Sequence, residues 1–156
     1  MGTLTTPLIT PRGVFLPISK AFLAQTILAE EEVLSRPQAD ILTEHVLHAG
    51  MYARTMTLPP NGVMVGALIK IPTMVIVSGS CYVYTEEGPL HLEGYHVIPA
   101  SANRKQVFMA QEETSITMFF PTQAETVEQA EQEFTDDYAR LVSRTGENKI
   151  TIGDMI

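Results

Sequence analysis

Four histidines are the side chains in this 156-residue chain best suited to binding a metal ion or moving a proton. His45 and His48 lie three residues apart, so they share a face in a helix and lie on opposite faces in a strand. His91 and His96 lie five residues apart, on opposite faces of an unbroken strand, although a bulge at Gly94 would realign them. Neither spacing matches a zinc or iron site, so we expect structural or surface roles and no bound metal.

Tyrosines near the second histidine pair offer a different chemistry. Tyr82, Tyr84 and Tyr95 lie close in sequence to His91 and His96, so a histidine base and a tyrosine acid are conceivable. Tyrosine is also an expected residue on a half-exposed strand. The chain has no glycine-rich phosphate loop before a helix and no Gly-x-Ser-x-Gly elbow, so the sequence disfavours nucleotide and serine-hydrolase chemistry.

Three basic residues, Arg54, Lys70 and Arg104, are the groups best suited to an anionic ligand if they point into a barrel. An outward lysine that protects a strand edge explains Lys70 equally well. The full candidate ligand-binding set is Arg54, Lys70, Tyr82, Tyr84, His91, His96 and Arg104.

Composition and net charge disfavour two classes of partner, nucleic acids and membranes. The net charge of −8 repels phosphate backbones, so we expect no nucleic-acid partner. No apolar run is long enough to cross a bilayer and the N-terminus lacks a secretory pattern, which predicts a cytoplasmic protein without a membrane partner. The single cysteine, Cys81, lies in an alternating apolar run and predicts a buried, inert thiol.

The central part of the chain predicts an antiparallel β-barrel or sandwich. Short apolar or alternating runs are separated by turn residues at 59–62, 78–79, 86–89 and 99–103. The spacing is too tight for helical crossovers. The predicted strands span 51–58, 63–70, 73–77, 80–85, 90–98, 105–110 and 115–120.

Helices are predicted on both sides of the barrel. Ser19 caps a helix over 20–34, Pro37 stops it, and a proline-containing arm precedes it. An apolar stripe on this helix comprises Phe22, Leu23, Ile27 and Leu34.

After Pro121 the pattern changes to a helical tail that starts with a capping box of Thr126 and Gln129. Its apolar face comprises Val127, Ala130, Phe134, Tyr138 and Leu141, and a solvated acidic face comprises Glu125, Glu128, Glu131 and Glu133.

Three motifs carry a family resemblance: HAGMYAR at 48–54, LPPNG at 58–62 and MVIVSG at 74–79. With them the chain resembles the cupin superfamily, and with the tail segment 131–137 it resembles small cupin-like proteins of tailed bacteriophages. The resemblance covers about 45–140 and implies a double-stranded β-helix, the cupin or jelly-roll barrel.

The cupin metal ligands have no counterparts here. The resemblance places a glutamate position at Pro72, two histidine positions near Gly66 and Leu68, and a third histidine position nearest Arg104. When the chain is aligned with the phage proteins instead, their ligand tract falls on residues 69–73. Lys70 is then the one residue of that tract that this chain shares. Both alignments imply a cupin scaffold whose metal site is lost, with no cofactor.

We therefore expect one domain: an arm and helix over 1–45 that pack on the barrel, a cupin-like β-barrel over 46–121 and a helical tail over 122–156. The preferred hypothesis is a non-catalytic module of phage or prophage type that self-associates, most simply as a dimer, or attaches to another protein such as a virion component. The alternative is a small-ligand binder, or a metal-independent isomerase or epimerase, that uses the barrel mouth.

Overall fold

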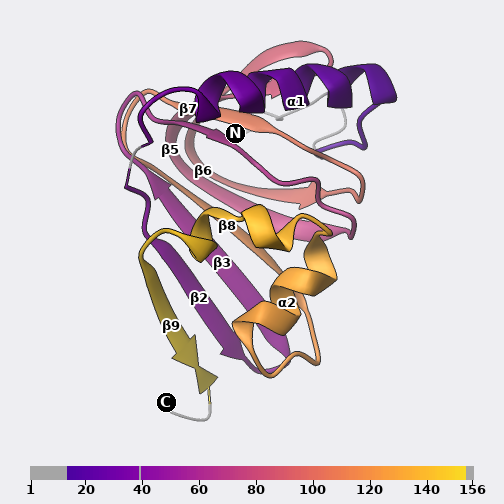
Figure 1. The fold of residues 1–156 in the computed structure, drawn as a ribbon, viewed down its shortest axis with the longest axis vertical. Helices are drawn as coiled ribbons and strands as arrows, with labels where there is room; N and C mark the ends of the chain where they lie inside the picture. The colour runs from indigo at the N-terminus through magenta and orange to yellow at the C-terminus, as the bar shows by residue number, and fades with distance from the viewer. Residues whose placement is uncertain (1–13, 39, 154–156) are drawn as a thin grey trace, which may run out of the picture.

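The computed structural model describes residues 14–38 and 40–153 (Figure 1). The predicted arm falls mostly on residues 1–13, outside the described residues. The elements in chain order are α1 (Lys20–Leu34), β2 (Thr43–His48), β3 (Met51–Leu58), β4 (Val63–Val65), β5 (Thr73–Thr85), β6 (Gly88–Ala100), β7 (Val107–Ala110), β8 (Thr114–Pro121), α2 (Val127–Phe134), the 3₁₀ turns η1 (Tyr138–Arg140) and η2 (Val142–Arg144), and β9 (Asn148–Ile152).

The strands form one curved, mixed sheet in the order β4-β7-β5-β8-β3-β2-β9, with β6 paired to β5. The mainly β prediction is confirmed, but a purely antiparallel sheet is wrong, because β9 runs parallel to β2 with Thr43 opposite Asn148. The same strand corrects the helical tail over 122–156. Residues 148–152 do not continue a helix but form a strand that lies beside β2 (Figure 1).

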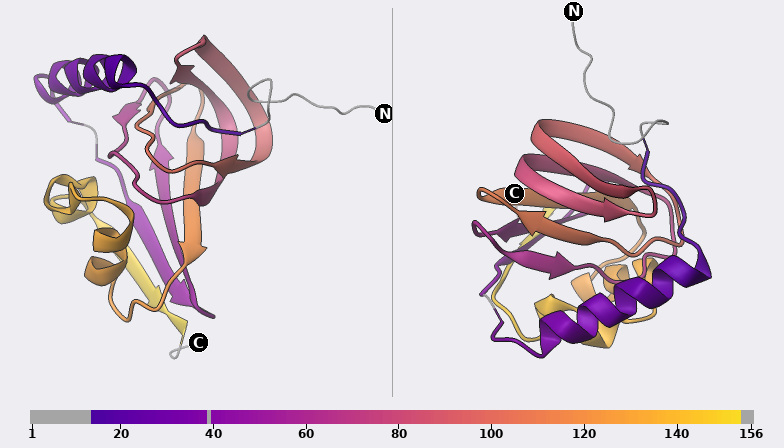
Figure 2. Two further views of the ribbon diagram at one scale, coloured as in Figure 1. Left: turned by 90° about the vertical axis from the view of Figure 1, so that its right-hand side faces the viewer. Right: turned by 90° about the horizontal axis from the view of Figure 1, so that it is seen from above.

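A bend at Gly79 gives the sheet its curvature. Sequence patterning predicted a turn at Ser78 and Gly79, whereas β5 runs through both residues and exchanges its partner there, from β8 to β7. Gly79 has a φ of +144°, and an added Cβ would lie 2.6 Å from the backbone oxygen of Glu113. Only glycine fits at this point. Gly94 of β6, with a φ of +89°, lies opposite it, and the ribbon shows β5 and β6 as strongly curved strands (Figure 2).

Two predicted strands are shorter in the structure. The run 63–70 forms β4 only as far as Val65, and the run 105–110 forms β7 only from Val107. The irregular backbone between them is still hydrogen bonded, since the Gly66 and Ile69 N–H groups donate to the carbonyls of Gln106 and Arg104. Pro72 lies just before β5, where its missing N–H breaks no ladder.

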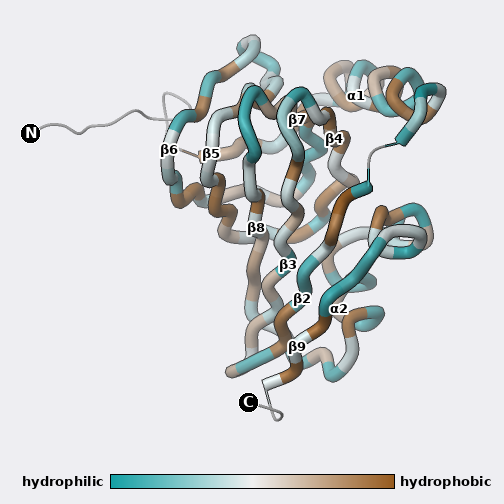
Figure 3. The backbone as a smooth tube through the Cα atoms, turned by 90° about the vertical axis from the view of Figure 1, so that its left-hand side faces the viewer, coloured by the Kyte–Doolittle hydropathy of each residue, from teal (hydrophilic) through white to brown (hydrophobic). Residues whose placement is uncertain are grey.

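Helix α1 begins as predicted, with Ser19 accepting a hydrogen bond from the Phe22 N–H. Two residues of the predicted apolar stripe are less buried than expected, since Leu34 is 54% exposed and Ile27 is also exposed. Leu28, outside that stripe, is 65% exposed. Hydrophobic and hydrophilic residues alternate around this helix and along the strands (Figure 3). Helix α1 therefore covers the sheet along one side and leaves apolar side chains in solvent.

Helix α2 has the predicted cap, since Thr126 accepts from the Gln129 N–H. Val127, Ala130 and Phe134 are buried as predicted, but the solvated acidic face is wrong for one member, because Glu131 is only 1% exposed. Position 131 lies one turn after Val127 and so falls on the buried flank of the helix.

Two groups of buried apolar side chains form the core. One fills the curved part of the sheet and includes Phe15, Val77, Cys81 and Phe108. The other lies between strands β2, β3 and β8 and helix α2, and it includes Tyr52, Phe120, Phe134 and Leu141. Within the part of the chain that the structure describes, no helix has the length and apolar character to span a membrane.

Candidate functional site

A cavity of about 220 Å³ lies where the two apolar groups meet. Its walls are mostly apolar and include side chains of both groups, such as Val75, Phe108, Met118 and Phe134. Helix α1 and the tail lie on the same side of the curved sheet (Figure 2), and both contribute residues to the cavity wall. Met56, Met64 and Met118 contribute flexible thioether chains, which adapt to ligand shape.

Three buried cations line this cavity: Arg54, Arg104 and Lys105. Burying a charge is costly unless an opposite charge or several hydrogen bonds compensate it. The partners of each cation therefore decide what role it has.

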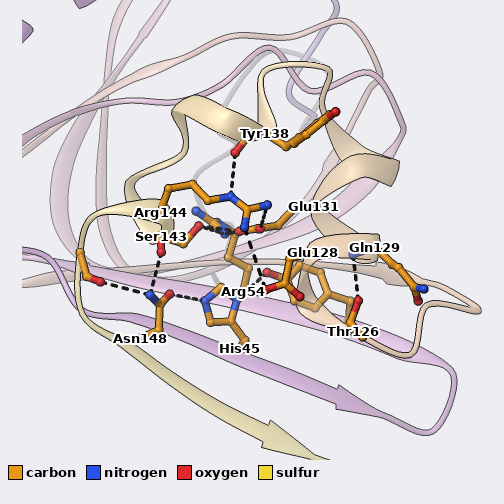
Figure 4. A network of polar contacts seen from close by, with 12 residues as sticks. His45, Arg54, Thr126, Glu128, Gln129, Glu131, Tyr138, Ser143, Arg144 and Asn148 are labelled. Carbon is orange, nitrogen blue, oxygen red and sulfur yellow. Dashed lines mark hydrogen bonds and ion pairs between the residues drawn. The ribbon is translucent and has the colours of Figure 1, made fainter.

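Arg54, on β3, is compensated by the tail (Figure 4). Its Nη1 lies 3.0 Å from Oε2 of Glu131 on α2, and its guanidinium lies over the Phe134 ring, 5.5 Å from the centroid. Ser143 also donates to Glu131, and Arg144 Nη2 lies 2.8 Å from the second Glu131 oxygen. Glu131 is thus held by two arginines and a hydroxyl.

A second set of hydrogen bonds joins the same region to β9. His45 Nδ1 lies 2.7 Å from the Tyr52 hydroxyl, and His45 Nε2 lies 2.7 Å from Oδ1 of Asn148 (Figure 4). The Asn148 side-chain amide donates to the carbonyls of Ser143 and Gly146. Burial lowers the pKa of His45 and raises that of Tyr52, so both side chains are neutral at pH 7. This set fixes β9 against β2.

Lys105 is compensated by α1. Its Nζ lies 3.0 Å from Oε2 of Glu30 and donates to the Gly66 carbonyl at 2.9 Å. The other Glu30 oxygen lies 3.9 Å from Arg140 Nη2 of η1. Glu30 therefore holds α1 over the cavity, which Val33 and Leu34 of the same helix also line.

Arg104 differs from both. It is 2% exposed, and its guanidinium donates two hydrogen bonds to neutral oxygens of the described residues: Nη1 to the Ser101 carbonyl at 2.8 Å and Nη2 to Thr73 Oγ1 at 2.6 Å. No Asp or Glu among the described residues forms an ion pair with it. Burial lowers the pKa of Arg104 to about 10, and it is still protonated at pH 7.

Of the seven predicted ligand-binding residues, Arg54 and Arg104 line the cavity and the other five do not. Lys70 lies 2.7 Å from Asp136 at the surface. Tyr82 of β5 stacks on His91 of β6 with ring centroids 4.9 Å apart. Tyr84, also on β5, is exposed. His96 contacts the Glu93 carbonyl of its own strand. A ligand role for these five stays a prediction.

Sequence reasoning missed Glu131, Lys105 and Glu30. The helical position of Glu131, between Val127 and Phe134, was a usable signal, because a residue at i+4 shares a face with the first. No comparable signal exists for Lys105, because it lies in an irregular segment without periodicity.

Cys81 matches its prediction of a buried, inert thiol. It is fully buried, and desolvation raises its pKa to about 11, so little thiolate is present at neutral pH.

The lost metal site inferred from the cupin resemblance stays a prediction, which concerns positions 66, 68, 72 and 104. Gly66, Leu68 and Pro72 carry no ligating side chain, and the Arg104 guanidinium is a cation. Within residues 14–38 and 40–153, no three His, Cys, Asp or Glu side chains form a group that could hold a metal.

No protein-family model matches the chain, and no curated protein matches it. The solved structures that it resembles include cupin and double-stranded β-helix proteins. An uncharacterized double-stranded β-helix protein from Klebsiella pneumoniae has 14% identity and a TM-score of 0.45, over 60% of this chain and 83% of its own. A cupin-2 domain protein from Shewanella frigidimarina has 10% identity and a TM-score of 0.42, over 64% of this chain and 98% of its own.

Oxalate oxidase in complex with the substrate analogue glycolate has 10% identity and a TM-score of 0.39, over 49% of this chain and 44% of its own. The match thus spans less than half of the oxalate oxidase chain. Identities and TM-scores this low do not support any transfer of function.

Proposed function

We propose that this chain is a small-molecule-binding module with a cupin-like barrel, and that the 220 Å³ cavity is its binding site. The observation that carries this proposal is the cavity itself, because ligand sites are typically apolar hollows with a few polar groups. An apolar cavity of about 150 Å³ holds benzene, so 220 Å³ accommodates a molecule of roughly nine non-hydrogen atoms.

The lining favours binding over catalysis. Among the described residues that line the cavity there is no serine, cysteine, tyrosine or histidine, the side chains that most often act as nucleophiles or bases. Its two carboxylates are those of Glu30 and Asp137, and Glu30 is already engaged with Lys105. We therefore propose a non-catalytic, cytoplasmic binding module.

A cavity-filling variant tests this function. Saturation-transfer NMR with a panel of molecules of six to ten or so non-hydrogen atoms should detect binding to the wild-type protein. Ala67→Phe fills the space that Ala67 lines and should abolish that binding, whereas Ala21→Leu, on the exposed first turn of α1, should not. The function is wrong if no member of the panel binds, or if Ala67→Phe binds as the wild type does.

Self-association is a second candidate function, favoured by the apolar side chains that α1 exposes, Ile27, Leu28 and Leu34. The occupant would be a second copy of the chain, giving a homodimer. Light scattering after gel filtration should give twice the chain mass for the wild type and for Lys20→Gln, and a monomer for Leu28→Gln. A monomeric wild type would contradict it. Attachment to a virion component stays a prediction of the phage resemblance alone.

A further inference from the structure

The cations around the cavity divide into those that the chain itself neutralises and one that it does not. Arg54 has Glu131, and Lys105 has Glu30. Arg104, although 2% exposed, has no carboxylate partner within the described residues. Native proteins usually pair their buried charges, and the described residues supply no such pair for Arg104.

The guanidinium of Arg104 has hydrogen-bonding capacity left for such a partner. It carries five N–H donors in a planar fork, and two of them are used by Ser101 and Thr73. Both of these acceptors are neutral oxygens, so they orient the fork without neutralising its charge. A planar fork with free donors matches a carboxylate better than any neutral group.

The surroundings of Arg104 define the rest of the ligand. The same cavity is lined by Met56, Val75 and Phe108, which offer no hydrogen bonds to a second polar group. Of the other polar side chains of the wall, those of Arg54 and Lys105 are held by ion pairs, and the Gln38 amide donates to the Val33 and Arg36 carbonyls. A molecule with one anionic end and an apolar body therefore fits this side of the cavity.

We propose that the cavity selects small monocarboxylates of about nine non-hydrogen atoms, with the carboxylate on the Arg104 guanidinium and the apolar body among the methionine and aliphatic side chains. This inference rests on the proposed binding function and names its ligand class. It assigns Arg104 as the residue that sets specificity, a role distinct from the structural role of Arg54.

Matched carboxylate and amide ligands test the inference directly. Isothermal titration calorimetry at pH 7.5 would compare hexanoate with hexanamide and benzoate with benzamide, pairs that differ in charge but hardly in shape. In the wild type the carboxylate of at least one pair should bind at least about tenfold more tightly than its amide. In Arg104→Met the preference should fall to about twofold or less, while Arg36→Met, which removes an exposed charge on the α1 C-terminal side, should keep the wild-type ratio.

The outcomes separate this inference from the proposed function. If amides bind as tightly as carboxylates in the wild type, the cavity is a binding site but Arg104 does not select anions, and the inference is overturned. If neither ligand type binds, the ligand class is wrong, and failure of the wider molecular panel as well would overturn the binding function. If Arg104→Met keeps the carboxylate preference, another cation holds the ligand and the inference is overturned.

A wild-type measurement covers the case in which Arg104→Met does not fold. In a ¹⁵N spectrum of the arginine Nε–H groups, assigned with Arg104→Lys, the Arg104 signal should move when benzoate or hexanoate is added and not when the amide is added. Movement of the Arg54 signal instead would contradict the assignment, because Arg54 is expected to stay on Glu131.

Discussion

Two buried arginines that line one cavity have different partners. For Arg54, α2 supplies Glu131 as a counter-ion and Phe134 as a ring beneath the guanidinium. Arg104 lies on the segment that connects β6 to β7, and within the described residues its guanidinium donates to the neutral oxygens of Ser101 and Thr73. The first charge is neutralised by the fold, and the second is not.

The difference indicates different reasons for burying a charge. A charge that is paired and hydrogen bonded within the protein stabilises a particular packing, here that of the tail on the sheet. A buried charge without a counter-ion lowers stability. Such charges are typical of functional sites, where a bound ligand supplies the counter-ion. The comparison therefore predicts a structural role for Arg54 and a recognition role for Arg104.

The largest effect is expected from Glu131→Gln. This variant leaves Arg54 buried without its counter-ion, so the free energy of unfolding should fall by about 3–5 kcal/mol. Glu128→Gln is the matched control, because Glu128 is exposed on the same helix and lies 4.0 Å from Arg144, and it should cost less than about 0.5 kcal/mol. Urea unfolding measures both. Equal losses would show that the Arg54–Glu131 pair does not hold the tail.

Replacing each arginine with methionine tests the comparison itself. Arg54→Met removes a compensated charge and should cost about 3 kcal/mol, because Glu131 loses its buried partner. Arg104→Met removes an uncompensated charge, so the loss of two hydrogen bonds is largely offset and the cost should be about 1 kcal/mol or less. Denaturant titration gives the difference, expected near 2 kcal/mol. A variant of Arg104 that is as unstable as that of Arg54 would refute the distinction.

A smaller effect is expected at α1, the helix that lines one side of the cavity. Glu30→Gln removes the counter-ion of Lys105 and should cost about 1–2 kcal/mol, less than a fully buried pair because the Glu30 side chain is partly exposed. The amide protons of α1 should then exchange faster, as measured by hydrogen–deuterium exchange. Glu32→Gln, on the same helix with the exposed partner Arg36, should change neither quantity. Unchanged exchange in Glu30→Gln would show that this ion pair does not hold α1.

The smallest effect is a pH dependence from His45. Burial lowers the folded-state pKa of His45 below its usual 6.5, although Glu131 and Glu128 oppose the shift and Arg54 adds to it. The unfolded chain therefore binds more protons at acidic pH, and stability that is present above pH 6.5 is lost as the pH falls toward the folded-state pKa. Between pH 7.5 and 5.5 the contribution should be no more than about 1.4 kcal/mol.

His45→Gln isolates that contribution. The other titrating groups are shared by both proteins, so the difference between wild type and variant in the pH dependence of urea unfolding belongs to His45. The wild type should lose more stability than the variant on acidification. The same loss in both would show that His45 does not titrate in this window.

Local signals in the sequence predicted much of the fold. The Ser19 cap, the limits of α1 and the strand over 51–58 were predicted at or near their observed positions, because capping and alternation act over a few residues. The bend at Gly79 was predicted as a turn, because a glycine flanked by serines gives the same local signal in both cases. Strand β9 was missed, because a short strand stabilised by pairing with β2, a hundred residues earlier, carries little signal of its own.

The candidate site was only partly predictable. The sequence by itself determined the mainly β class, the helix caps, the negative net charge and a set of candidate residues that included Arg54 and Arg104. Only the tertiary structure decided that Glu131 lies beside Arg54 whereas no carboxylate of the described residues lies beside Arg104. The physical reason is that charge compensation depends on distances of a few ångströms between segments far apart in the chain, and residue type and spacing do not specify those distances.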